Sequence, residues 1–116
     1  MSVPITIPVT IASGASLSAA IDLKDYSYRL VGIQMPSAWT TAGLSFQASV
    51  DGSTFQEVFS GGSAYSIAAL VSQYVIVPVN DFAGIQVFKV RSGTSGTPVA
   101  QGADRILYLV LQKLRP

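Results

Sequence analysis

Six carboxylates and one tryptophan are the side chains of this sequence whose types could support catalysis or ligand binding. The sequence contains no histidine and no cysteine, so it lacks an imidazole base, a thiolate nucleophile, the usual zinc ligands and disulfides. The carboxylates are those of Asp22, Asp25, Asp51, Glu57, Asp81 and Asp104. Three of them, at positions 51, 81 and 104, lie beside glycine-containing or loop segments, where a carboxylate typically hydrogen-bonds the backbone of its own turn. Because no nucleophile with a base and no committed acid pair is present, the sequence predicts that this protein is not an enzyme.

The patterns that bind metals, phosphates and nucleic acids are also missing. Asp22 and Asp25 could contribute to a calcium site, but they lack the dense D-x-D-x-D spacing of a committed one. Neither GxGxxG nor GK followed by Ser or Thr occurs, so no phosphate-binding loop is expected. The seven basic and six acidic residues are scattered and give a net charge of +1, without the basic run that nucleic-acid binding needs. We therefore expect no metal, no cofactor and no nucleic-acid partner.

Trp39 is the single tryptophan and lies in a predicted loop over residues 37–43. A loop tryptophan commonly folds back to cap the open end of a β-sandwich, and less commonly offers its ring to a sugar or a protein. We favour the cap and keep the stacking surface as the alternative.

The clearest structural pattern is residues 44–59, LSFQASVDGSTFQEVF. Leu44, Phe46, Ala48 and Val50 alternate with polar residues, which is typical of a half-buried strand. The dipeptide Asp51-Gly52 favours a tight turn, and residues 55–59 return as a second strand. This segment is predicted to be a β-hairpin whose phenylalanines belong to the core and whose Asp51 serves its own turn.

Residues 1–11 and 105–113 form the two remaining distinctive segments. Pro4 and Pro8 share one parity of the first segment, so both remove N–H donors from the same edge of a strand. This pattern predicts an edge strand or, alternatively, an arm exchanged with a neighbouring subunit. The second segment contains six consecutive apolar residues, 106–111, which predicts a central strand or one whose outer face a subunit covers.

Further strands are predicted over residues 26–35, 73–79 and 85–91, with Phe82 as the buried anchor of the turn at 80–84. The 26–35 pattern places Tyr28 and Leu30 on one face and Val31, Ile33 and Met35 on the other. Residues 64–72 fit either a helical turn or a ragged strand, and residues 92–102 form a long Gly/Ser/Thr loop. Together these segments predict one domain over residues 1–116, an all-β antiparallel jelly-roll β-sandwich of about seven or eight strands.

The surface implied by the composition is unusually poor in charge. Hydrophobic residues make up 49% of the chain and charged residues 11%, against about 25% charged residues in an ordinary domain. One explanation of the low charge content is a surface of uncharged polar residues. We favour the other explanation, a surface covered by copies of the chain or by a partner. No stretch approaches 18 apolar residues, and the first residues lack the basic segment of a signal peptide, so neither a membrane span nor secretion is expected.

An ordered set of segments resembles known families. SFQASVDGSTFQEV followed by DFAGIQVFKVRSG is similar to the discoidin and galactose-binding-like jelly rolls. The run over residues 21–112, with MPSAWTTAG and GTSGTPVAQGADRILYLVLQ, looks like small head-associated proteins of tailed bacteriophages. The resemblance implies a β-sandwich that decorates or cements a capsid, or forms the base of a head fibre. It further implies a homotrimer that contacts the major capsid protein on the virion surface after synthesis in the host cytoplasm.

The expected function is therefore that of a non-enzymatic virion structural protein, with a glycan-binding jelly-roll module of a phage head or tail fibre as the alternative. Glycan binding ranks second because the sequence lacks histidine, has few loop aromatics beyond Trp39, and has no cluster of Arg with Asp or Asn. The candidate contact residues lie in the first segment, in the loops and near position 116: Val3, Ile5, Ile7, Val9, Trp39, Thr94, Thr97, Lys113 and Arg115.

Overall fold

The structure is a computed structural model that describes residues 4–23 and 28–113. These residues form an all-β fold with antiparallel sheets, which confirms the all-β, antiparallel part of the prediction and is compatible with a β-sandwich. The strands are β1 (Pro4–Ile11), β2 (Ile21–Asp22), β3 (Tyr28–Gln34), β4 (Leu44–Ser49), β5 (Gln56–Glu57), β6 (Phe59–Ser60), β7 (Ser63–Ala64), β8 (Ser66–Ile67), β9 (Tyr74–Ile76), β10 (Val87–Ser92) and β11 (Arg105–Lys113). The described segments outnumber the predicted strands because the chain between positions 56 and 76 is divided into short pieces.

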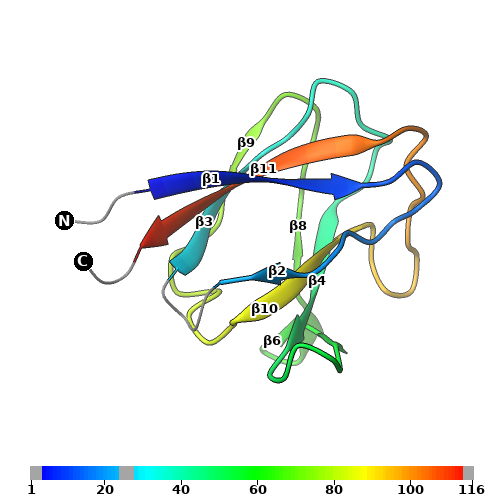
Figure 1. The fold of residues 1–116 in the computed structure, drawn as a ribbon. Coiled ribbons are helices and arrows are strands. Elements are labelled where there is room, and N and C mark those ends of the chain that lie inside the picture. Colours follow the sequence, from blue (N-terminus) through cyan, green and yellow to red (C-terminus); the bar gives the residue numbers. More distant parts are fainter. Residues whose placement is uncertain (1–3, 24–27, 114–116) are drawn as a thin grey trace.

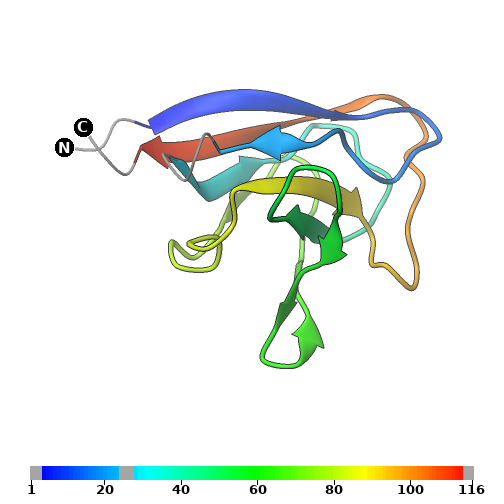
Figure 2. The ribbon, with the colours of Figure 1, turned by 60° about the horizontal axis from the view of Figure 1, so that its bottom comes forward.

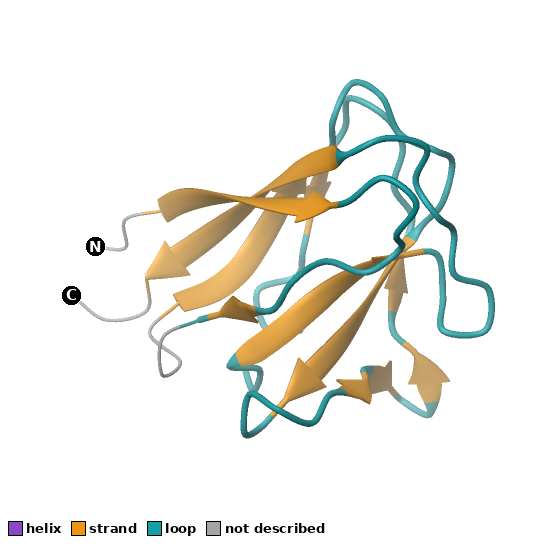
Figure 3. Ribbon diagram, turned by 45° about the vertical axis from the view of Figure 1, so that its right-hand side comes forward, coloured by secondary structure: helices purple, strands orange, loops and turns teal. Residues whose placement is uncertain are grey.

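Two sheets face each other, and their loops gather at one end of the molecule (Figure 3). The first has the strand order β1-β11-β3-β9, and the second has the order β2-β10-β4-β5, with β8 also paired to β4. The pairings are nested along the chain, since β1 pairs with β11, β2 with β10, β3 with β9 and β4 with β8. Figure 1 shows the first sheet above the second, with β1 and β11 side by side.

The core lies between the two sheets and is built from alternate residues of each strand. In the first sheet, Leu107, Leu109 and Leu111 of β11 point inward. In the second, Phe46 of β4 packs edge-on against Phe88 of β10, at 6.2 Å between ring centroids. Phe82 lies 5.1 Å from Phe46 and is only 1% exposed, which confirms it as the buried anchor of its turn. Burying such aromatic rings supplies much of the apolar area that stabilises a small domain.

The predicted hairpin at residues 44–59 is present but shorter than expected. β4 and β5 pair antiparallel, with Gln47 opposite Glu57. Asp51 orders the turn, because its Oδ1 accepts hydrogen bonds from the backbone N–H groups of Ser53 and Thr54 at 2.8 and 2.9 Å.

The prediction that all phenylalanines of this hairpin join the core is wrong for Phe55 and Phe59. Phe59 is 61% exposed, and the half-buried Phe55 lies outside the core cluster, with Nζ of Lys89 4.3 Å from its ring. β5 ends at Glu57, and the chain then turns away into the separate β6–β7 hairpin, which projects from the body in Figure 2.

A β-bulge in the first sheet corrects the predicted faces of residues 26–35. The register between β3 and β11 shifts so that Gly32 lies opposite Val110 while Leu30 lies opposite Leu111. The extra residue on β3 is Val31, and it allows both Leu30 and Ile33 to be fully buried. Strict two-residue alternation had placed these two side chains on opposite faces, but a bulge reverses the alternation beyond it.

β1 lies at the edge of its sheet and pairs along its whole length with β11 of the same chain. Pro4 and Pro8 are four residues apart, so the N–H groups that they lack would both point away from β11. The arrangement is that of the edge-strand alternative, and the free edge of β1 is a poor template for a further strand.

Two predicted segments resolve into shorter elements. Residues 64–72 contain the last residue of β7 and the whole of β8, and they form no helix. This agrees with the ragged-strand alternative. The predicted strand at 73–79 is reduced to β9, with Val75 and Val77 buried and Ile76 77% exposed. Residues 21–22 form the short strand β2 beside β10.

Candidate contact surface

The candidate contact residues of β1 face the core of their own chain. Val9 is 7% exposed, and Ile5 and Ile7 are partly buried against the core cluster. They alternate along β1 with Thr6, Pro8 and Thr10, which are exposed. The side chains of Ile5, Ile7 and Val9 therefore point toward the second sheet. The prediction that Ile5, Ile7 and Val9 contact a partner is therefore corrected, because these side chains pack against the core of their own chain. Val3 lies outside the described residues.

Trp39 is buried, with 7% of its surface exposed, and its indole Nε1–H donates to the carbonyl of Ala42 at 3.0 Å. The structure supports the capping alternative, because a ring with so little exposed area cannot stack on a sugar. Its place among the contact candidates is corrected for the same reason.

Gln101 holds the loops together at the end where Trp39 lies. Its side chain is buried and makes four hydrogen bonds, which is the full capacity of a primary amide. Its Oε1 accepts from the backbone N–H of Thr40 at 2.8 Å and from Nε of Arg105 at 3.1 Å. Its Nε2 donates to the carbonyl of Thr40 at 3.0 Å and to Oγ of Ser92 at 2.7 Å. This residue was not among the candidates, since nothing in a Gly/Ser/Thr loop marks one polar residue as buried.

The loop over residues 92–102 is ordered and presents its tip to solvent. Thr94 and Thr97 are exposed and bond each other through their backbones in both directions at 3.2 Å. The turn begins at Gly93, which has φ +90°, and a Cβ there would lie 2.5 Å from the carbonyl oxygen of Thr97. Glycine is thus required at this position. The two threonines stay available as contact residues, and so does the exposed Lys113 at the end of β11. Arg115 lies outside the described residues.

Exposed apolar side chains gather on the side of β11 and its neighbours that faces away from the second sheet. We call it the outer face and define it by Tyr74 and Ile76 of β9 and Ile106, Tyr108 and Val110 of β11. Four of these side chains are 42–77% exposed, and Val110 is half-buried. The register places them together, because Tyr108 lies opposite Gln34, which lies opposite Tyr74, and Val110 lies opposite Gly32, which lies opposite Ile76.

Tyr74 lies flat on this face because its neighbour is a glycine. A Cβ added to Gly32 would lie within 2.8 Å of three atoms of the Tyr74 ring. The absent side chain therefore leaves room for the ring to cover the sheet, an arrangement that stabilises glycine within a strand. The Tyr74 side chain thus lies over Gly32 of β3, the strand between β9 and β11.

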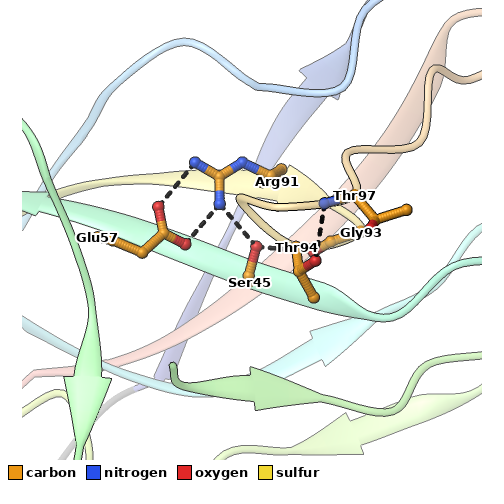
Figure 4. Close-up of polar contacts among 6 residues, drawn as sticks. All are labelled: Ser45, Glu57, Arg91, Gly93, Thr94 and Thr97. Atoms are coloured by element: carbon orange, nitrogen blue, oxygen red, sulfur yellow. Dashed lines mark hydrogen bonds and ion pairs between the residues drawn. The ribbon is translucent and has the colours of Figure 1, made fainter. Parts of the chain in front are cut away.

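A polar network occupies the opposite side of the molecule, on the outer surface of the second sheet (Figure 4). Arg91 forms a bidentate ion pair with Glu57, with N–O distances of 2.5 and 2.8 Å. Arg91 also donates to Oγ of Ser45 at 3.1 Å, and Ser45 in turn donates to the carbonyl of Gly93 at 2.7 Å. The Arg91 and Glu57 side chains are 8% and 17% exposed. The network joins β4, β5 and β10 to the start of the 92–102 loop. Its charged groups, Arg91 and Glu57, are bonded to each other rather than presented to a ligand.

Replacing Arg91 with methionine is expected to lower the free energy of unfolding by about 2–3 kcal/mol, because a nearly buried carboxylate loses its partner. Replacing Arg91 and Glu57 together with methionine should recover most of that loss, since no unpaired charge remains. Urea denaturation measures both. Lys89→Met, which removes a cation 4.3 Å from the Phe55 ring, is the control and should lose only about 0.5–1 kcal/mol. A double variant no more stable than Arg91→Met would contradict the ion-pair explanation.

The carboxylates of Asp51, Asp81 and Asp104 take part in hydrogen bonds within the fold, and Asp25 lies outside the described residues. Hydrogen bonds from the backbone N–H groups of Thr54 and Ser53 hold the pKa of Asp51 below its ordinary value. Oδ2 of Asp81 accepts from the Tyr65 hydroxyl at 2.6 Å, and burial together with this bond raises the pKa of Tyr65. Oδ1 of Asp104 accepts from the backbone N–H of Ser13 at 2.8 Å. Asp51 therefore supports its own turn as its position predicted. For Asp81 and Asp104 that prediction is wrong, because their partners are the side chain of Tyr65 and the backbone of Ser13, far away in the sequence.

A hollow of about 390 Å³ lies beside the turn that Asp51 orders, and it is lined mainly by Ala48, Val50, Thr54 and Ile85. Its lining contains one carboxylate, that of Asp51, whose Oδ1 is already bonded to its turn. Across the described ranges, no three acidic side chains come together as a metal site, and no helix of those ranges has the length and apolar character needed to cross a bilayer.

Comparison of the chain with protein-family models, with curated proteins and with solved structures finds no match.

Proposed function

We propose that this chain is a jelly-roll structural protein of the virion, which decorates or cements the capsid of a tailed bacteriophage. It acts through contacts between subunits and with the major capsid protein rather than through chemistry. The observation that carries this proposal is the outer face, an uncharged apolar surface on one side of a small domain.

The strand order supports the jelly-roll assignment. A jelly roll is a long antiparallel hairpin of eight strands folded across itself, so that its four strand pairs are nested and divided between two sheets. The pairs β1–β11, β2–β10, β3–β9 and β4–β8 follow this pattern. Jelly rolls recur in viral capsids and in lectins, which are the two classes of function that the resemblance suggests.

The outer face supports a role in assembly. A monomeric domain seldom exposes a contiguous apolar patch without a partner for it. Ile76 is 77% exposed, and Ile106, Tyr108 and Tyr74 are each 42–55% exposed on the same side. The continuous apolar run at residues 106–111 predicts cover on both sides of β11, while the chain itself covers only the side that holds Leu107, Leu109 and Leu111. A second protein surface is the simplest cover for the other side.

A glycan-binding module is the second candidate. With Trp39 buried, the aromatic rings available for stacking on a sugar are Tyr74 and Tyr108, which are 55% and 42% exposed on one flat face. Sugar-binding sites also need polar groups that converge on the hydroxyls. Gln34 is the exposed polar residue between these rings in the register, so the structural role is favoured.

Co-sedimentation tests the proposal. The purified protein is mixed with capsids assembled from the major capsid protein encoded in the same genome, and the bound fraction is measured after centrifugation. We expect saturable binding at a fixed number of copies per capsid, weakened by Ile76→Lys and unchanged by Val50→Lys, since Val50 is 93% exposed and distant from the outer face in the sheet order. Absence of capsid binding, or binding of a defined glycan that Tyr108→Ala abolishes, would overturn the virion role.

A further inference from the structure

We infer that the outer face binds a second copy of this chain, with the two β1-β11-β3-β9 sheets packed face to face about a two-fold axis at Tyr108. The inference deepens the proposed function and rests on its use of the outer face as a contact surface. It goes beyond that proposal by naming the occupant of the face and the residues that set its register.

The centre of the face has the chemistry of an interface core. Ile106, Tyr108 and Val110 lie in one row along β11, with Ile76 and the Tyr74 ring beside them. None of these residues is charged, and tyrosine and isoleucine side chains of this exposure release much apolar area from water when they are covered. Sheets pack against each other through such rows, with the strands of the two sheets nearly aligned.

Opposite charges lie at the two ends of the same face. At one end is Arg29, whose register partner Gln112 follows Tyr108 by four residues. At the other end is Asp104, which precedes Tyr108 by four residues, lies just before the start of β11 and is exposed. Its Oδ1 accepts from the backbone N–H of Ser13 at 2.8 Å, so the inference requires its other carboxylate oxygen to meet the partner. A cation and an anion are thus placed at equal steps, about 14 Å, on either side of Tyr108.

One donor of the Arg29 guanidinium lacks an acceptor in the part of the chain that the structure describes. Its Nε is buried and has no hydrogen-bond partner among the described residues. A buried donor of this kind is destabilising until an acceptor reaches it. A carboxylate is the acceptor that matches a guanidinium best, because it can take two parallel N–H bonds.

Two-fold symmetry brings these two ends together. A two-fold axis in the plane between the sheets and perpendicular to the strands reverses the direction of β11 in the second copy. Arg29 then lies over the end of the sheet that holds the partner's Asp104, and the same contact is made a second time by symmetry. The lateral offset is one strand spacing, about 4.8 Å, since Arg29 is on β3 and Asp104 continues the line of β11. An arginine side chain spans that offset.

This self-complementarity separates a second copy from other occupants. A capsid surface would have to supply one acid and one base at the matching separation, whereas a second copy supplies both. The two-fold contact differs from the trimer that the family resemblance implies, and it leaves Thr94, Thr97 and Lys113 free to contact the capsid.

The size of the face sets the expected strength. The four strands offer roughly 450 Å² of flat sheet per copy, or about 900 Å² in total, which is at the lower end for specific interfaces. A dimer with a dissociation constant in the micromolar range or weaker is therefore expected. Capsid attachment would strengthen it, because copies held side by side meet at high effective concentration.

Sedimentation equilibrium across a concentration series tests the inference on the purified full chain without capsids. We expect a reversible transition from 12.2 kDa to twice that mass. Arg29→Asp and Asp104→Arg should each raise the dissociation constant about tenfold or more, and the double exchange should restore it. Ile76→Lys should also weaken the dimer, and because its side chain is 77% exposed the fold should tolerate it. Circular dichroism checks the fold of each variant.

Lys113→Asp is the matched control, since it reverses a charge at the same end of β11 but on the opposite parity from Tyr108. It should leave the dissociation constant unchanged. A monomer at every concentration, a trimer, or a double exchange that fails to restore association would overturn the inference. A monomer that still binds capsids would overturn the inference alone, while a dimer that binds no capsid would overturn the proposed function and leave the interface standing.

Discussion

Replacing Gln101 with alanine is expected to lower the free energy of unfolding by about 3–5 kcal/mol, one of the two largest losses for a single residue considered for this chain. The substitution removes four hydrogen bonds at once and leaves the backbone N–H and carbonyl of Thr40 and the hydroxyl of Ser92 without their partners. Such groups are costly because the closed loop end gives them little access to water. Urea denaturation followed by tryptophan fluorescence measures the change, with Trp39 as the reporter.

Gln56→Ala is the control for Gln101, since Gln56 is an exposed residue of the same type on β5. It should change stability by no more than about 0.5 kcal/mol. Gln101→Glu keeps the shape of the side chain but removes both donors, so it should also be strongly destabilised. If Gln101→Ala were as stable as Gln56→Ala, the amide would not be what holds the loops at positions 36–43 and 92–102 together.

Replacing Trp39 with alanine is expected to lower the free energy of unfolding by about 3–5 kcal/mol, as for other buried aromatic residues. The ring is 7% exposed and belongs to the core cluster, so its removal leaves a cavity beneath the loop end. Thermal unfolding followed by circular dichroism measures the effect. Trp39→Phe should retain most of the packing and lose about 1 kcal/mol with the Nε1 hydrogen bond to Ala42.

This experiment also separates the two interpretations of Trp39 that the sequence left open. A stacking tryptophan at a binding site would be dispensable for stability, so its alanine variant would unfold near the wild-type midpoint and lose affinity for a glycan. A capping tryptophan gives the opposite pair of results. Full stability in Trp39→Ala would therefore contradict the structural role.

The pattern of apolar residues was sufficient to predict most of the strands. β11 spans Arg105–Lys113, the same residues as the predicted strand, because six apolar residues in sequence leave no other plausible element. The β4–β5 hairpin was found because Asp51-Gly52 is a strong turn sequence. The bulge at Val31 could not be found in this way, since an inserted residue changes the parity without changing the composition of the strand.

The contact residues were harder to predict, and the reason is physical. Alternation in β1 shows that Ile5, Ile7 and Val9 share a face, but an apolar face suits a core and an interface equally well. The structure assigns it to the core. The run at residues 106–111 contained the better signal, because its even positions Ile106 and Tyr108 are 45% and 42% exposed among the described residues. Gln101 had no signal at all, since its burial results from three loops that meet only in the folded protein.

The nested pairing has a consequence for the order in which the chain can fold. β11 lies between β1 and β3, so these two strands have no hydrogen-bonded neighbour in common until residues 105–113 have left the ribosome. The first sheet is therefore complete only after residues 105–113 have been synthesised. Until then β1 lacks its strand partner β11, and its apolar side chains stay uncovered. Contacts between segments so far apart in sequence form slowly, and the waiting strand is open to aggregation. The two prolines of β1 limit that risk on one edge only, because the N–H groups that they lack belong to the edge that faces away from β11.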